Sequence, residues 1–236
     1  MIKVENIDVW GFEHAVRGCR NPMNSWDKSD SICGINCDEC TIEGCENCKV
    51  LNGIGNIIGK NDLDLMRRLY KAGTEHRKYL RQIFVSLDIT APLYWWKEFD
   101  TYKVGTVANS CSTMHKIAAK EFELDDFSYE HLRFEYSDGD GSYDQATWAE
   151  GSLLTTIATL NRARELYLKS KDKKHWWLMI QLLPSSYNQK RTITMNYENV
   201  ATMIKQRSGH KLDEWRDFVE ILKQLPYIKE VIGDVE

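Results

Sequence analysis

The chain has 236 residues, which is enough for one large domain with a well-formed core or for two small domains at most. Its hydrophobic fraction of 42% and charged fraction of 28% are ordinary for a globular protein and argue against disorder, and its net charge of −4 gives no reason to expect duplex nucleic acid as a partner. No apolar run is long enough to cross a membrane, and residues 1–8 lack the apolar core of a secretion signal, so we expect a cytoplasmic protein.

The predicted elements begin with a short helix over residues 9–18, closed by a glycine, and a polar loop over residues 21–30. A second helix is predicted from Asp62, a plausible N-cap, because apolar residues recur from there at helical spacing until Gly73. Residues 83–89 then alternate as a strand does, and Pro92 ends that run.

Helical patterns dominate the remainder of the chain, over residues 93–99, 109–122, 151–169, 197–207 and 212–224, with a short strand over 192–195. Asn109 is a candidate cap for the helix predicted at 109–122, and we expect Cys111 on it to be a small apolar core residue. Neither a repeat nor a linker interrupts the order, so we expect a single domain over residues 1–236.

Five of the seven cysteines fall between Cys33 and Cys48, and in a chain of this size without a secretion signal such clustering favours metal over disulfides. The two Cys-x-x-Cys pairs can each chelate through one tight turn, and they predict a tetrahedral zinc site with the ligands Cys37, Cys40, Cys45 and Cys48. An iron–sulfur cluster, disulfides and free thiols remain open alternatives, and Cys33 is either a further ligand or a bystander. A zinc ion there would order an insertion at about 33–48 rather than catalyse a reaction.

Arg207 is the strongest candidate for a binding residue that comes from helical spacing. Val200, Met203, Ile204 and Arg207 recur at i, i+3, i+4 and i+7, which places the guanidinium on the apolar stripe of the helix. A cation that faces the core needs a partner, because its desolvation costs several kcal/mol. That partner is either a bound anion or an acidic side chain of the chain itself; the third alternative is a stem that snorkels at the helix end and keeps the guanidinium in water.

Two pieces of the sequence resemble the flavin-dependent thymidylate synthase family, which uses reduced flavin to methylate deoxyuridylate. One piece is Ile89-Thr-Ala-Pro92-Leu-Tyr-Trp-Trp96, followed after a gap by Asn109-Ser-Cys-Ser112-Thr-Met-His115. The other is Leu183-Pro184, with Asn196 twelve residues further on and Arg207 eleven residues after that. Together the two pieces cover roughly residues 62–225.

The resemblance implies an α+β fold in which helices flank a small, mostly antiparallel sheet, and a homotetramer with active sites at subunit junctions. It implies FAD as cofactor, contacted by Asn109 and Asn196, with Lys103 as a point charge for a phosphate. Ser112 would lie close to the uracil ring of a pyrimidine nucleotide, Arg207 would contact that substrate, and a folate would supply the carbon.

The sequence also departs from the family signature at its phosphate-binding positions. Tyr102-Lys103-Val104 stands where the family has Arg-His-Arg, Met114 stands for an arginine after the signature serine, and Ile180 stands for another before the Leu-Pro turn. Arginine binds phosphate through a bidentate fork that these side chains do not offer. The alternative function is therefore a non-catalytic nucleotide-binding or scaffold homologue that has lost the methylation chemistry.

Overall fold

The computed structural model describes residues 2–33, 56–132, 135–137, 143–145 and 147–233. The chain divides into two compact units. The first comprises Met1–Lys3, Ile89–Thr101 and Asn109–Arg191, and the second comprises Val4–Asp88, Tyr102–Ala108 and Thr192–Glu236. Among the described residues, no helix combines the length and apolar character that a membrane crossing requires.

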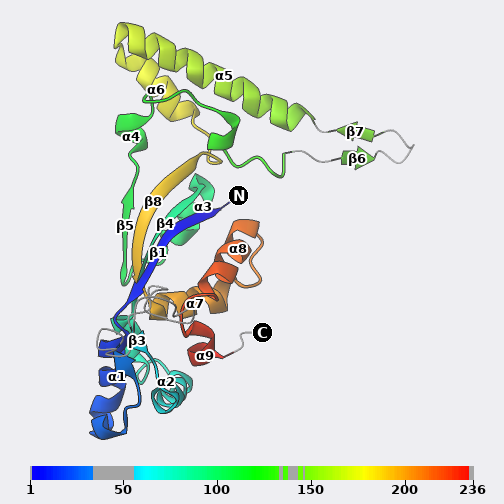
Figure 1. Ribbon diagram of the computed structural model, residues 1–236. Helices are drawn as coiled ribbons and strands as arrows, with labels where there is room; N and C mark the ends of the chain where they lie inside the picture. The colour runs from blue at the N-terminus through cyan, green and yellow to red at the C-terminus, as the bar shows by residue number, and fades with distance from the viewer. Residues whose placement is uncertain (1, 34–55, 133–134, 138–142, 146, 234–236) are drawn as a thin grey trace, which may run out of the picture. The chain divides into compact units, whose positions relative to one another are not determined.

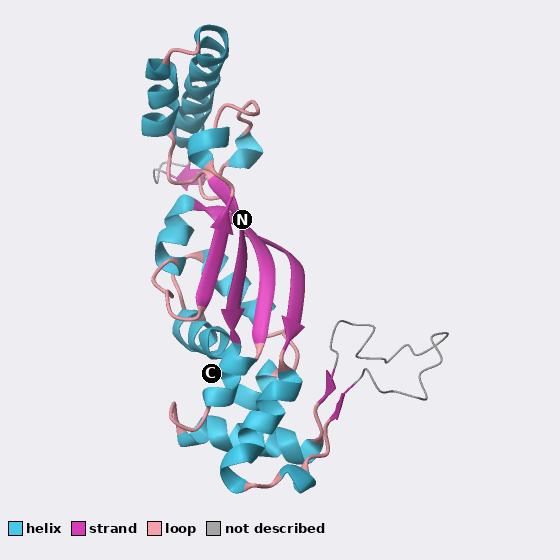
Figure 2. Cartoon of the chain, turned by 90° about the vertical axis from the view of Figure 1, so that its left-hand side faces the viewer, coloured by secondary structure: helices cyan, strands magenta, loops and turns pink. Residues whose placement is uncertain are grey.

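A four-stranded antiparallel sheet has the order β1-β4-β8-β5, with β1 at Lys3–Trp10, β4 at Phe84–Pro92, β8 at Asn188–Asn196 and β5 at Thr106–Ser110 (Figure 2). Side chains confirm the direction of the central pair: Thr192 Oγ1 donates to Asp88 Oδ1 at 2.6 Å. Two residues later along β8 and two earlier along β4, Thr194 Oγ1 donates to Ser86 Oγ at 3.2 Å. The predicted α+β class with a small antiparallel sheet is thus confirmed.

β4 shows why the strand forms where the sequence alternates. Its side chains alternate between half-buried and buried, and Val85, Leu87, Ile89 and Ala91 supply the buried face. Because successive side chains point to opposite faces of a strand, one face of β4 belongs to the core. The strand predicted over 83–89 is confirmed and extends to Pro92.

The first unit is built around a helical hairpin of α5 (Thr147–Ser170) and α6 (Lys173–Leu182), drawn in green and yellow in Figure 1. Lys171 makes the turn between them with a φ of 56°. The unit also contains two short helices, α3 (Leu93–Phe99) and α4 (Thr113–Lys116), the 3-10 turn η5 (Leu124–Asp126), and the antiparallel pair of β6 (Glu135–Ser137) and β7 (Tyr143–Gln145). Its core cluster comprises Ile117, Phe122, Phe127, Leu153, Ile157, Leu160, Ala163 and Met179.

The second unit holds α1 (Phe12–Arg20), α2 (Lys60–Ala72), α7 (Tyr197–Arg207), α8 (Asp213–Leu222) and α9 (Ile228–Ile232). Among the described residues of this unit, 3-10 turns lie at η1 (Asn21–Met23), η2 (Trp26–Lys28) and η4 (Lys78–Gln82). α7 and α8 pack against each other, and their fully buried side chains include Tyr197, Trp215 and Phe218.

The first predicted helix is present but shifted along the chain, at Phe12–Arg20 instead of residues 9–18. Residues 3–10 form β1, and the first helix begins only at Phe12, after Gly11 turns the chain with a φ of +97°. A Cβ at Gly11 would lie 2.1 Å from the carbonyl oxygen of Gln82, so only glycine fits this turn.

The helix predicted over residues 109–122 is wrong, because β5 runs through Ser110 and α4 has only four residues. Pairing of this segment with β8 overrides its helical pattern: the Cys111 N–H donates to the Lys190 carbonyl at 2.9 Å.

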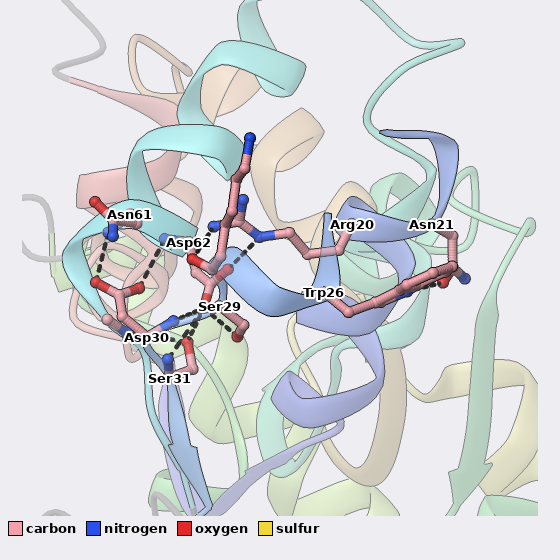
Figure 3. A network of polar contacts seen from close by, with 10 residues as sticks. Arg20, Asn21, Trp26, Ser29, Asp30, Ser31, Asn61 and Asp62 are labelled. Carbon is pink, nitrogen blue, oxygen red and sulfur yellow. Dashed lines mark hydrogen bonds and ion pairs between the residues drawn. The ribbon is translucent and has the colours of Figure 1, made fainter. Parts of the chain in front are cut away.

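Asp62 is the centre of a buried polar network rather than the N-cap that the sequence suggested (Figure 3). Its side chain is 1% exposed, and one carboxylate oxygen accepts from Arg20 Nε at 2.7 Å. The other oxygen accepts from the Ser29 and Ser31 hydroxyls and from the backbone N–H groups of Asp30 and Ser31. A buried carboxylate persists when its lone pairs are satisfied in this way.

The same network fastens the start of α2 to the strand that precedes the cysteine-rich segment. Asp30 accepts from the backbone N–H groups of Asn61 and Asp62, two of the free donors at the helix N-terminus. The Gly59 N–H donates to the Ser31 hydroxyl at 3.0 Å, and a Cβ at Gly59 would lie 2.2 Å from the Asp30 carboxyl carbon. Next to these contacts, β2 (Ile32–Cys33) pairs with β3 (Asn56–Ile57), so that Cys33 and Asn56 are direct partners.

Candidate functional site

Arg207 lies at the end of α7 on the face that the helical spacing predicted. Val200, Met203 and Ile204 are each 0% exposed, and Arg207 on the same face is half-buried. Its Nε donates to the Tyr102 hydroxyl at 2.9 Å. The guanidinium carbon lies 4.8 Å from the ring centre of Trp215 and 5.5 Å from that of Tyr102. The guanidinium therefore contacts two aromatic rings, an arrangement that contributes about 0.5–2 kcal/mol.

Tyr102 fixes the orientation of this guanidinium. Its hydroxyl accepts from Arg207 Nε and donates to Gln206 Oε1 at 2.9 Å. Trp215 is fully buried in α8 and gives the planar cation a rigid surface. Tyr102 lies at the first position of the triplet where the family has Arg-His-Arg, so the departure in sequence supplies a partner for Arg207.

Asn196 caps α7, as a polar residue before a helix commonly does. Its Oδ1 accepts from the Asn199 N–H at 3.1 Å. Asn199 Nδ2 in turn donates to the Val104 carbonyl at 2.9 Å. Gly105 has a φ of +73°, and a Cβ there would lie 2.4 Å from Asn196 Nδ2, so both the conformation and the close approach favour glycine. The two asparagines therefore hold the turn that leads into β5. Lys103 lies in this turn and is exposed.

Glu198, in the first turn of α7, binds two arginines that precede β4, Arg77 and Arg81. Arg77 Nε donates to one of its carboxylate oxygens at 3.4 Å, and Arg81 forms an ion pair with the other. Burial of Glu198 raises its pKa, but the hydrogen bonds and positive charges of Arg81 and Arg77 outweigh burial and hold that pKa below its ordinary value. The carboxylate also lies where the positive end of the helix dipole favours it.

In the first unit, Asn109 and Ser112 occupy different places from those the sequence suggested. Asn109 is an exposed residue of β5, so the prediction that it caps a helix was wrong. Ser112 is the cap, since its side chain accepts from the His115 N–H at 3.1 Å. The expectation of Cys111 as a core residue was also wrong, because this cysteine is exposed.

A second arginine, Arg191, lies beside this segment within the first unit. Gln189 is buried, and its Nε2 donates to the Cys111 carbonyl at 2.9 Å. Its Oε1 accepts from Arg191 Nε at 2.9 Å, and Arg191 Nη1 donates to Asp100 Oδ1 at 2.7 Å. The sequence offered only a weak signal for this group, an arginine on a strand whose alternate residues are buried.

The structure divides the predicted site residues between the two units. Arg207, Asn196 and Lys103 belong to the second unit, and Asn109 and Ser112 to the first. Within the second unit, Asn196 and Arg207 stand at opposite ends of α7, about 16 Å apart along its axis at the helical rise per residue. The four cysteines predicted to bind zinc, Cys37, Cys40, Cys45 and Cys48, lie outside the described residues. Within the residues described, no three histidine, cysteine, aspartate or glutamate side chains gather as a metal site requires.

No protein-family model matches the sequence. No curated protein matches it either. Solved structures do: a structure of thymidylate synthase X (ThyX) from Helicobacter pylori with FAD and dUMP is 16% identical with a TM-score of 0.62, and the match covers 99% of this chain and 98% of that one. A second structure of flavin-dependent thymidylate synthase ThyX from Helicobacter pylori, complexed with FAD and dUMP, matches with the same identity and TM-score over 98% and 99% of the two chains. The chain has the ThyX fold. At this identity the likeness establishes the architecture, and the chemistry has to be argued from the residues.

Proposed function

We propose that the chain is a ThyX-like enzyme that acts on a pyrimidine nucleotide at carbon 5 of uracil, by methylation or a related transfer. The observation that carries this proposal is the half-buried Arg207 guanidinium, oriented by Tyr102 and Trp215 at the position that the Asn196-to-Arg207 interval marks in the family. A guanidinium with a fixed plane suits the planar or forked oxygens of a nucleotide better than a mobile cation does.

The residues of the chain would bind and orient the nucleotide. Arg207 of one subunit would hold an anionic or carbonyl oxygen of the substrate, and Ser112 of another subunit would donate or accept a hydrogen bond near the uracil ring. The Ser112 hydroxyl accepts from the backbone N–H of His115, which is a capping contact, so we assign it positioning and not nucleophilic attack. We propose FAD as the cofactor because the two ThyX structures were solved with FAD and dUMP. A bound reduced flavin would supply a hydride, and a folate would supply the carbon.

The fit of a flavin to these residues is partial. Lys103 and Asn109 are exposed and available to a ligand. Asn196 is only 9% exposed, and its amide is occupied by the cap of α7 and by the close approach of Gly105. The chain therefore offers Lys103 as a point charge and Asn109 as an exposed amide, and Met114 and Ile180 stand at positions where the family signature has arginine.

This partial fit supports a second candidate function, a non-catalytic nucleotide-binding or scaffold homologue. Met114 is 47% exposed and Ile180 is half-buried, so neither family arginine position carries a charge. Under this alternative the protein would bind the nucleotide through Arg207 and take up no flavin.

We also propose that the protein is a homo-oligomer, with a tetramer as the form that the family suggests. The α5–α6 hairpin exposes large apolar side chains, including Trp148 at 71% and Trp177 at 45%. Surfaces of this kind are commonly covered by another protein surface. Sedimentation equilibrium of the purified protein measures the assembly, and a monomer at micromolar concentration would contradict the proposal.

Zinc at the cysteine-rich insertion remains a proposal that rests on the spacing of Cys37, Cys40, Cys45 and Cys48. Metal analysis of the protein purified without chelator should give about one zinc per chain. Iron with a visible charge-transfer absorbance would indicate an iron–sulfur cluster instead, and the absence of both metals would favour disulfides or free thiols.

One preparation tests the function. We expect the purified protein to show or acquire flavin absorbance with added FAD, and to bind dUMP in isothermal titration calorimetry. Arg207→Ala should weaken dUMP binding about 10- to 100-fold, because a charged hydrogen bond contributes about 1.5–3 kcal/mol. Arg68→Ala removes the same side chain from the exposed surface of α2 in the same unit and should leave dUMP binding unchanged.

The outcomes separate the two candidates. Binding of dUMP without flavin uptake would support the nucleotide-binding homologue and exclude the flavin enzyme. Equal dUMP affinity in Arg207→Ala and in the unchanged protein would remove Arg207 from the site. Absence of dUMP binding would contradict both functions.

A further inference from the structure

Arg191 is a largely buried cation that the family resemblance does not account for. Its side chain is 14% exposed, and its guanidinium carbon lies 4.2 Å from the ring centre of Trp96, which is itself 1% exposed. The Trp96 indole N–H donates to the Gln189 carbonyl at 2.9 Å, so the ring cannot turn away from the guanidinium. A guanidinium held in such surroundings needs an anion, because its desolvation is otherwise uncompensated.

The anion in this structure is Asp100, a side chain that contributes little else. Asp100 is 53% exposed, and Arg191 Nη1 donates to its Oδ1 at 2.7 Å. It is the C-cap of α3, where the carbonyl end of the helix dipole disfavours a negative charge. An exposed carboxylate at such a position can rotate into solvent at low cost. The carboxylate oxygens of Asp100 occupy the position at which the oxygens of an anionic ligand would bind Arg191.

Gln189 links this arginine to the segment that carries Ser112. Its Oε1 accepts from Arg191 Nε at 2.9 Å, and its Nε2 donates to the Cys111 carbonyl at 2.9 Å. The residue is 8% exposed, and both ends of its amide are in use. Gln189 therefore fixes the direction of the guanidinium fork and holds it in a constant relation to the residue that precedes Ser112.

We propose that Arg191 is an anion-binding residue for the phosphate monoester of the nucleotide, and that Asp100 occupies the place of that phosphate until the ligand displaces it. The inference rests on the proposed function for the identity of the nucleotide, but the anion site itself does not. Arg191 would supply the bidentate phosphate contact that Tyr102-Lys103-Val104, Met114 and Ile180 do not offer.

The test compares two substitutions, one at Asp100 and one at Arg191, that should change the affinity for phosphate in opposite directions. Isothermal titration calorimetry with dUMP, deoxyuridine and inorganic phosphate is carried out on the full chain. Asp100→Asn removes the competing charge and should tighten dUMP and phosphate binding about 3- to 10-fold, within the range that one partly exposed ion pair affords. Arg191→Gln should weaken both at least 10-fold. Deoxyuridine, which lacks the phosphate, should bind equally to all variants.

Two further variants test whether a general change of charge, and not the geometry of the Arg191–Asp100 pair, explains the measured affinities. Asp125→Asn removes one exposed negative charge elsewhere in the first unit and should not change the affinity for phosphate. Arg191→Lys keeps the charge but loses the planar fork, so it should bind phosphate more weakly than the unchanged protein and more tightly than Arg191→Gln. If Arg191→Gln fails to fold, the pair Asp100→Asn and Arg191→Lys still decides the matter.

The affinities measured for phosphate and dUMP distinguish the anion site from the proposed nucleotide function. Phosphate binding with the expected pattern but no dUMP binding would support the anion site and contradict the proposed nucleotide function. Binding of dUMP that is equal in all variants would overturn the role of Arg191 and leave the nucleotide function standing. No phosphate binding by Asp100→Asn, or weaker binding than in the unchanged protein, would also overturn the inference.

Discussion

Asp62 shows how much of this fold can depend on one carboxylate. It accepts hydrogen bonds from Arg20, the last residue of α1, and from Ser29, Asp30 and Ser31, which lie together between η2 and β2. Burial raises the pKa of Asp62, but the hydrogen bonds from Ser31, Ser29 and Arg20 outweigh burial and hold the pKa below its ordinary value. The folded state therefore gains stability from the ionised carboxylate.

We predict that Asp62→Asn lowers the free energy of unfolding by about 3–5 kcal/mol at neutral pH, because it leaves the Arg20 guanidinium buried without its counter-ion. The folded pKa is below the unfolded value of about 3.9, so the stabilisation is fully present above that value. It is lost as the pH falls through the folded pKa. Urea unfolding at pH 6, 4 and 3 should therefore show the difference between the two proteins shrinking with pH.

Asp64→Asn is the matched control for this measurement. Asp64 lies on the same helix and pairs with Arg68, but both side chains are more than half exposed. Its substitution should change the free energy of unfolding by less than about 1 kcal/mol. A difference between Asp62→Asn and the unchanged protein that stays constant from pH 6 to pH 3 would show that the charge of Asp62 is not the cause.

Arg207 shows which properties of a binding site can be predicted from the spacing of residues along a helix and which cannot. The i, i+3, i+4, i+7 pattern placed its guanidinium on the inner face of α7, because that pattern is a property of the helix alone. The contacts with Tyr102 and Trp215 depend on which segments pack against α7, and no local pattern encodes that choice. Arg191 went unnoticed for the same reason, since its partners come from α3 and from a neighbouring residue of its own strand.

Among the elements, long amphipathic helices and the alternating central strand were predictable, and β1 and β5 were not. α2, α7 and β4 bury one regular face each, so their periodicity is visible in the sequence. β5 is exposed at most of its positions and exists because β8 offers it hydrogen-bonding partners. A strand that is stabilised by its neighbour and buries little has no alternating pattern to detect.

The antiparallel pairing of β2 with β3 predicts that the connection between the two strands can be shortened. Because Cys33 and Asn56 are direct partners, a two-residue Asn-Gly turn can join them in place of residues 34–55. The Asp62 network lies outside the deleted residues, so we expect the shortened chain to fold with a melting temperature within about 4 °C of the full chain, a change of about 1 kcal/mol. Differential scanning calorimetry measures this shift.

The shortened chain also serves as the control for zinc. It should carry no zinc, because it lacks all four predicted ligands, and Asp62→Asn should destabilise it as much as it destabilises the full chain. A shortened chain that does not fold would mean that residues 34–55 contribute to the stability of the second unit.

For the whole molecule, the α+β class with an antiparallel sheet followed from the sequence, and the division into two units did not. Each unit is assembled from three separate stretches of the chain. Composition and local periodicity describe neighbouring residues, whereas such a division depends on contacts between distant ones. The ThyX resemblance correctly indicated the architecture because its motifs are tied to the order of the elements and to the intervals between them.

The two central strands, β4 and β8, are far apart in the sequence, and this separation affects how the chain folds. Asp88 and Thr192 are 104 residues apart in the sequence, and Ser86 and Thr194 are 108 apart. The entropy of closing a loop this long is lost before any pairing compensates for it, which slows folding. During synthesis β4 is complete long before β8 has been made, so β4 can pair with β1 on one edge while its other edge stays unpaired for many seconds. Expression at reduced temperature, or with a chaperone that shields strand edges, should therefore favour recovery of the protein over aggregation.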